Sequence, residues 1–120
     1  MKKLIDANVI LRYLLGDSQE MSEKAKLIIE EGAYTIPEVL AEVVYVLKGV
    51  YHINRYEICD TLVELLDEIE IEHSEVIKYS LKLFASSSLD FVDCVLIARN
   101  KLLKEKVFTF DLKLNKYLLA

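Results

Sequence analysis

Residues 2 to 16, KKLIDANVILRYLLG, contain a short apolar segment, an acid and an amphipathic segment in direct succession. KKLI predicts a β-strand that ends at Asp6, and ANVILRYLLG has the apolar periodicity of a helix. The helix is expected to end at Gly16, because glycine readily adopts the left-handed conformation that follows many helices. A strand that runs directly into a helix is typical of α/β proteins, and here it leaves an acid at the carboxyl end of the strand.

The rest of the chain repeats this alternation. Thr35 with Glu38, and Asn54 with Glu57, have the spacing of capping boxes at helix starts, and Pro37 suits a first helical turn. Strands interleaved with helices favour a parallel sheet covered by helices. Further strands are predicted at 33–36, 68–72 and 106–110, and helices at 18–31, 37–51, 55–68, 74–84 and 90–105, with one or two helical turns in the tail.

Length and composition predict one globular domain over residues 1–120, because 53% of the residues are hydrophobic and no Pro- or Gly-rich linker interrupts them. No apolar run reaches the roughly 18 to 20 residues of a membrane helix. Asp6 interrupts the apolar start too early for a secretory signal. We therefore expect a soluble, cytoplasmic protein that does not associate with membranes, with Cys59 and Cys94 as free thiols in apolar helices.

The distribution of charge limits the classes of partner. A net charge of −5 argues against a domain that binds nucleic acid only through a basic surface. Residues 99–116 nevertheless carry six basic residues against two acids, so this end of the molecule could face phosphate. Solvated helix faces are the alternative interpretation of the same lysines.

Three acids are expected near the carboxyl ends of strands, where ligands bind in open parallel sheets. Asp6 follows the first strand and Asp111 follows the last. Glu42 lies in the helix after the second strand, at the border of an apolar arc that contains Val39 and Val46. Considered singly, each acid also fits a turn, a helix cap or a surface position.

Residues 88–98, SLDFVDCVLIA, place two further acids in an apolar run. Asp90 suits the N-cap of a helix, and Asp93 lies three residues later, where the helix dipole favours a carboxylate. Residues 94–98 are uncharged, so the turn that carries Asp93 is predicted to be buried. A buried carboxylate costs several kcal/mol unless it is paired or coordinates a metal, and this favours a ligand role for Asp93.

Convergence of Asp6, Glu42, Asp93 and Asp111 at one edge of the sheet would require a cation, because the carboxylates would otherwise repel one another. Oxygen ligands without cysteine or histidine select Mg²⁺ or Mn²⁺ over zinc. One or two such ions suit the hydrolysis of a phosphodiester. Arg12, or basic residues from Arg99 to Lys116, could then contact flanking phosphates.

Four segments in this order, DANVILRYLL, VLAEVVYVL, DFVDCVLIA and VFTFD, resemble PIN domains, and among them the VapC-type toxins of toxin-antitoxin pairs. The resemblance implies a three-layer α/β/α sandwich with a parallel sheet of four or five strands. It also implies metal-dependent endoribonuclease activity on RNA, a homodimer and a small antitoxin partner. The family's acidic centre corresponds to Asp6, Glu42, Asp93 and Asp111, with Asn8 and Thr109 at polar positions beside it. Asp90, as the predicted helix cap, would have at most a supporting role near the metal.

Other functions remain open at this point. A PIN fold could bind RNA or protein without cleavage, or process RNA in a housekeeping role. A receiver-like signalling domain is disfavoured because Ala7, and not a second acid, follows Asp6. A dehalogenase-type phosphatase would need two aspartates where this chain has Asp6-Ala7-Asn8. The chain continues for nine residues after Asp111, which leaves a fifth strand short or missing.

Overall fold

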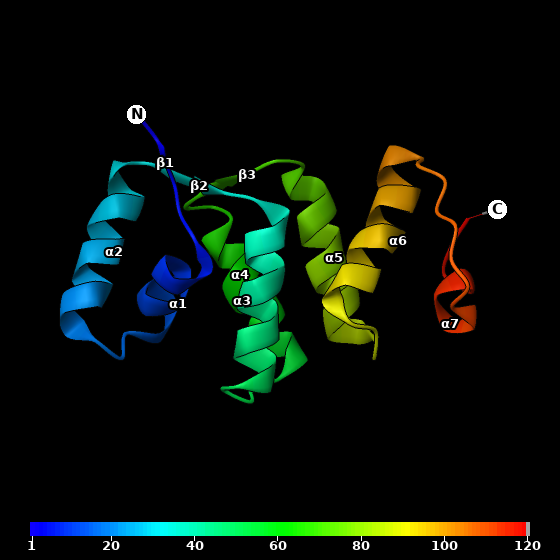
Figure 1. Cartoon of the computed structure of the whole chain (residues 1–120), viewed down its shortest axis with the longest axis horizontal. Coiled ribbons are helices and arrows are strands. Elements are labelled where there is room, and N and C mark those ends of the chain that lie inside the picture. Colours follow the sequence, from blue (N-terminus) through cyan, green and yellow to red (C-terminus); the bar gives the residue numbers. More distant parts are fainter. Residues whose placement is uncertain (120) are drawn as a thin grey trace.

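The computed structural model describes residues 1–119 and shows an α/β fold in which helices and strands alternate (Figure 1). The strands are short, and the helices pack around them and continue beyond the sheet. The elements are β1 (Lys3–Leu4), α1 (Ala7–Leu15), α2 (Gln19–Glu31), β2 (Ala33–Thr35), α3 (Pro37–Gly49), α4 (Arg55–Leu65), β3 (Glu70–Ile71), α5 (Ser74–Ser86), α6 (Phe91–Leu103) and α7 (Leu112–Asn115).

The sheet has three parallel strands in the order β1-β2-β3. The predicted α/β class and parallel sheet are confirmed, whereas the predicted four or five strands are wrong. Residues 106–110 form no strand. Side chains hydrogen-bond the backbone there instead, because Thr109 Oγ1 accepts the N–H of Asp111 and Asn115 Nδ2 donates to the carbonyl of Thr109. Strand propensity alone does not form a strand without a neighbouring edge.

One continuous hydrophobic core joins most helices to the sheet. Its fully buried side chains come from the apolar faces that the helical periodicity predicts, as in α1 and α3. Phe84 of α5 meets Phe91 of α6 edge to face, with ring centroids 6.2 Å apart. Cys59 and Cys94 are buried free thiols, as predicted.

Helix ends follow the sequence signals with one exception. Gly16 has φ +62° after α1, and the side chains of Asn54 and Asp90 accept the N–H groups of Glu57 and Asp93. The predicted capping role of Thr35 is wrong, because its hydroxyl donates to the carbonyl of Ile5 at 2.9 Å and Ile36 occupies the N-cap. Thr35 thus ties β2 to the end of β1, directly before Asp6.

Replacing Thr35 with valine should destabilise the fold by about 1–2 kcal/mol, because the carbonyl of Ile5 loses its buried donor while the packed volume is kept. Thr35 is 1% exposed. Urea unfolding measures the change, with Thr61→Val on the half-buried face of α4 as the control, which should stay within about 0.5 kcal/mol. An equal effect of both substitutions would contradict the role of this hydrogen bond.

The molecule is elongated. Its principal-axis extents are 49 × 32 × 19 Å, and its Cα radius of gyration is 15.0 Å, against about 13.6 Å for a compact domain of this length. Figure 1 shows the reason: α6, α7 and the segment between them extend away from β1, beyond α5. The buried Asn100 fastens the tail to α6, since it donates to the carbonyl of Glu105 at 2.9 Å and accepts the N–H of Leu119 at 2.8 Å.

Within the described residues 1–119, the helices are all too short or too polar to cross a membrane.

Candidate acidic site

Asp93 lies at the N-terminus of α6 in a half-buried position. Its N–H donates to Asp90 Oδ1 at 2.9 Å, so Asp90 is the helix cap that the sequence predicts. Burial raises the pKa of Asp93, and the negative charges of Asp90 and Asp111 raise it further. The fold therefore holds this carboxylate at an electrostatic cost, which a bound cation would remove.

Asp111 approaches Asp93 from the N-terminus of α7. Its Oδ1 accepts the N–H groups of Lys113 and Leu114 at 2.9 and 3.0 Å. Lys113 Nζ donates to Ser88 Oγ at 2.5 Å. Its positive charge opposes part of the rise in the pKa of Asp93 that burial and the neighbouring acids cause. Sequence reasoning counted Lys113 only within a basic stretch, although its position two residues after Asp111 could have marked it.

Asp6 and Glu42 lie on other elements, Asp6 directly before α1 and Glu42 in α3. Asp6 caps α1 through a 3.0 Å hydrogen bond from the N–H of Val9, and both Asp6 and Glu42 are exposed. Asn8, in the first turn of α1, is also exposed. Helices α1 and α3 pack together, but neither acid is among the charges that shift Asp93.

Asp6 and Glu42, the N-terminal acids, are therefore not gathered with Asp93, Asp111 and Asp90, the C-terminal acids. Within residues 1–119, no three His, Cys, Asp or Glu side chains lie together in a way that could hold a metal ion. The donor chemistry suits Mg²⁺ or Mn²⁺. The arrangement within the described part of one chain does not fit such an ion.

A cavity of about 420 Å³ lies beside the C-terminal acids. Asp90 and Phe91 line one side, and Val44, Tyr45 and Lys48 of α3 line another. Arg55, which no sequence pattern marks, also lines this cavity. Arg55 Nη1 donates to the carbonyls of Phe84 and Leu89, and its guanidinium lies 4.1 Å from the centroid of the Phe84 ring. Arg55 thereby fixes the turn that leads into α6.

Comparison with known families covers almost the whole chain: the description "PIN domain" matches residues 3–117. The chain belongs to the PIN domain family. PIN domains are in general nucleases. Searches of the curated proteins and of the solved structures gave no match.

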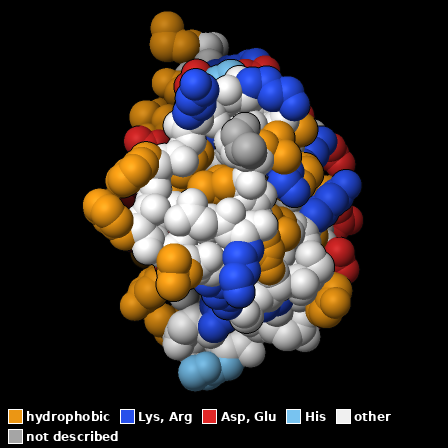
Figure 2. All heavy atoms as spheres, turned by 90° about the vertical axis from the view of Figure 1, so that its right-hand side faces the viewer, with side chains coloured by type: hydrophobic (Ala, Val, Ile, Leu, Met, Phe, Trp, Pro, Cys, Tyr) orange, Lys and Arg blue, Asp and Glu red, His pale blue; other side chains and the backbone are white. Residues whose placement is uncertain are grey.

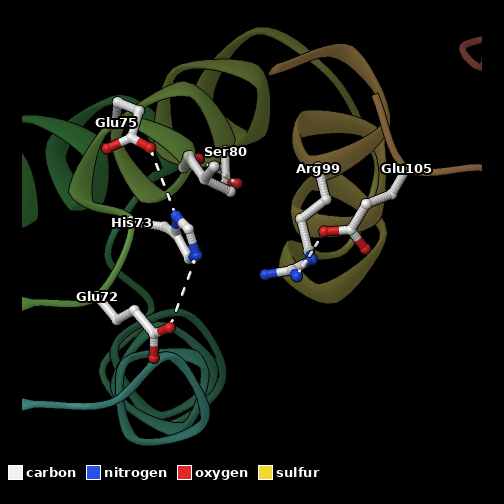
Figure 3. A network of polar contacts seen from close by, with 7 residues as sticks. Glu72, His73, Glu75, Ser80, Arg99 and Glu105 are labelled. Carbon is white, nitrogen blue, oxygen red and sulfur yellow. Dashed lines mark hydrogen bonds and ion pairs between the residues drawn. The ribbon is translucent and has the colours of Figure 1, made fainter. Parts of the chain in front are cut away.

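Both arginines considered for phosphate contacts are paired with acids in this PIN domain. Arg12 Nη1 donates to both carboxylate oxygens of Asp17, at 2.9 and 2.8 Å. Arg99 Nη2 donates to Glu105 Oε1 at 2.6 Å, as Figure 3 shows. One terminal nitrogen of each guanidinium is thus engaged by a carboxylate, which offsets part of the attraction of either arginine for phosphate.

The histidines lie away from the acidic site. His73 is exposed and in the left-handed conformation, and its two ring nitrogens are 3.6 Å from Glu72 and Glu75 (Figure 3). His52 is likewise exposed with a positive φ. Both histidines are therefore surface residues.

The end of the PIN domain that carries α7 is basic. Figure 2 shows lysine and arginine side chains spread over this face between hydrophobic ones, with acids mostly at its margins. Lys104, Lys106, Lys113 and Lys116 are exposed there. The predicted charge gradient along the sequence thus becomes a basic surface next to the C-terminal acids.

Proposed function

We propose that this PIN domain is an endoribonuclease that requires Mg²⁺ or Mn²⁺ and hydrolyses RNA phosphodiester bonds. The family match over residues 3–117 carries the proposal, because PIN domains are in general nucleases. The raised pKa of Asp93, caused by burial and by its acidic neighbours, adds a site-specific reason to expect a cation. A carboxylate held in this way gains stability when a metal neutralises it.

The proposed catalytic and metal-binding residues are Asp6, Glu42, Asp93 and Asp111. All four supply oxygen ligands, which Mg²⁺ and Mn²⁺ prefer. Such an ion, when bound, would activate water and neutralise charge on the leaving oxygen. Asn8, Asp90 and Thr109 are proposed to support these acids. Asp90 and Thr109 do so through hydrogen bonds to the N–H groups of Asp93 and Asp111.

The proposed path of the RNA follows the cavity beside Asp90. Tyr45 is 76% exposed at its rim, and an exposed aromatic ring can stack on a base. Lys48 lines the same cavity and Lys113 lies at the acids. These lysines are better placed for phosphate than Arg12 and Arg99, whose guanidinium groups are already paired.

In finer terms, we propose a VapC-type toxin that acts in the cytoplasm as a homodimer and is inhibited by a small antitoxin. The four sequence segments shared with such toxins support this assignment. A small overlapping upstream reading frame for a DNA-binding protein would support a toxin. Its absence would favour a housekeeping ribonuclease.

Cleavage of a synthetic RNA and of transfer RNA should occur with Mg²⁺ or Mn²⁺, stop with excess chelator and return when Mn²⁺ is added in excess. Calorimetry should show Mn²⁺ binding that Asp6→Asn greatly weakens. The physical reason is that carboxylates dominate the ligands and lose affinity when one charge is removed.

Two results would contradict the proposal. Undiminished cleavage in chelator would exclude a metal requirement. Absence of both cleavage and Mn²⁺ binding at millimolar metal would exclude the metal-dependent nuclease and favour a PIN fold that acts without cutting. Asp60→Asn, on the exposed surface of α4, is the matched control and should bind Mn²⁺ as the wild type does.

A further inference from the structure

Strand β1 has a free edge. Within residues 1–119 it pairs only with β2: Ile5 donates its N–H to Tyr34 of β2, and Lys3 donates its N–H to Gly32 just before β2. The N–H and carbonyl of Leu4 therefore point toward the opposite, open side. The side chain of Leu4 is 54% exposed. A short strand edge with apolar exposure is a surface to which another extended segment can add.

The segment from Val107 to Leu112 is strand-like in sequence but pairs with no strand in the described part of the chain. Phe108, Phe110 and Leu112 are 83, 89 and 80% exposed, whereas Val107 and Thr109 are half-buried. This alternation gives the segment one apolar face, as in a β-strand. The rings of Phe108 and Phe110 lie together on that face, with centroids 5.1 Å apart. Among the described residues, nothing covers this face.

The free edge and the apolar segment cannot meet within one copy as it is folded. They lie toward opposite ends of the long axis, with α3, α5 and α6 between them (Figure 1). Helix α6 is packed on α5 through Phe84 and Phe91, and Asn100 holds the tail on α6. Moving the segment to β1 of the same chain would break these contacts.

We propose that two copies of this chain exchange these surfaces: residues 107–110 of each copy add to the free edge of β1 in the other. Asp111 follows this segment directly, as Asp6 follows β1, so the pairing brings Asp111 of one copy toward Asp6 of its partner. The acidic centre of the proposed nuclease is then completed between copies. This last step rests on the proposed function, whereas the exchange itself does not.

The shape of the protomer suits this exchange. Two elongated molecules laid side by side in opposite directions place each β1 edge beside the partner's C-terminal segment. Both contacts are then equivalent, and the assembly closes as a two-fold dimer. The separation of the N-terminal acids from the C-terminal acids within one chain follows from the same arrangement.

Light scattering after gel filtration tests the dimer. The wild type should have twice the protomer mass of 13.8 kDa, and the double variant Phe108→Ser, Phe110→Ser should be a monomer with an unchanged circular dichroism spectrum. Leu27→Ser, which removes an exposed apolar side chain from α2, should remain a dimer. A monomeric wild type, or a double variant that stays dimeric, would overturn the proposal.

Cross-linking tests the contact itself. One chain carries Leu4→Cys and a differently tagged chain carries Phe108→Cys, so an adduct between them can form only between copies. A short bismaleimide should join them in high yield. Two copies of the Leu4→Cys chain should join much less, and the wild type not at all because its thiols are buried. Equal yields for all pairings would rule out this contact.

Mixed dimers test the shared centre. We consider a dimer of one Asp6→Asn chain and one Asp111→Asn chain. With exchange, one site keeps both Asp6 and Asp111, and the other site has lost both. About half of the wild-type cleavage should therefore return. No return, with an active wild type, would show that each centre lies within one chain. If the wild type cleaves no RNA, the proposed function fails, and mass and cross-linking alone decide the exchange.

Discussion

Asparagine in place of Asp93 is expected to lower RNA cleavage by roughly 100-fold or more, while the folded chain becomes at least as stable as the wild type. Cleavage is lost because the proposed ligand loses its charge. Stability is kept because the half-buried Asp93 carries a raised pKa, caused first by burial and then by Asp90 and Asp111. Removing its charge removes that repulsion.

The pH dependence of stability gives a second measurement of the same substitution. The carboxyl group of Asp93 binds its proton more tightly in the folded state than in the unfolded chain. Asp93 therefore lowers the stability of the fold as the pH rises from the ordinary pKa of 3.8 through the raised pKa. In chelator, the melting temperatures of Asp93→Asn and wild type should therefore differ little below about pH 4. Above that pH the melting temperature of the variant should become the higher one, by a margin that grows and then levels off.

Glu57 provides the matched control for Asp93. Its N–H also donates to the cap of its helix, here Asn54 Oδ1 at 2.8 Å, but its side chain is exposed on α4. Glu57→Gln should leave cleavage unchanged. Full activity of Asp93→Asn would remove this residue from the proposed centre.

Alanine in place of Phe84 is expected to destabilise the fold by about 3–5 kcal/mol, because it leaves a cavity in the core. Phe84 is 1% exposed and packs against Phe91 at the start of α6. Its ring also supports the guanidinium of Arg55, which binds the carbonyls of Phe84 and Leu89. The loss therefore affects the same turn that positions Asp90 and Asp93.

Urea unfolding of Phe84→Ala should show the full loss, and Phe84→Leu a smaller one because it keeps most of the volume. Tyr56→Ala removes an aromatic side chain that is 68% exposed on α4 and should stay within about 0.5 kcal/mol. A loss below about 1 kcal/mol for Phe84→Ala would mean that α5 and α6 repack without this ring.

Local signals predicted the helices well. Gly16, Asn54 and Asp90 each occupy the cap that the sequence predicts, because capping depends on neighbours within a few residues. The predicted strand at 106–110 failed because a strand needs a partner edge, and β1 is not beside it in this chain. The predicted capping role of Thr35 was wrong for a related reason. Its hydroxyl donates a hydrogen bond to the carbonyl of Ile5, which lies thirty residues away in sequence.

The arrangement of the candidate acids was not predictable from the sequence. The burial and acidic surroundings of Asp93 agree with the pattern of SLDFVDCVLIA. Whether Asp6 and Glu42 join Asp93 and Asp111 depends on strand order and on partners, which no local pattern encodes. The contacts of Lys113 and Arg55 were not predictable from the sequence, because they join residues that are distant along the chain.

The buried thiol of Cys94 makes the junction of α5 and α6 measurable. Its side chain is inaccessible in α6, and burial raises its pKa to about 11, so alkylation near neutral pH requires α6 to open first. The rate of modification then reports how often this helix leaves its neighbour. If the C-terminal part of the molecule moves as a unit when copies associate or RNA binds, the alkylation rate of Cys94 will change. No engineered cysteine is needed for this measurement.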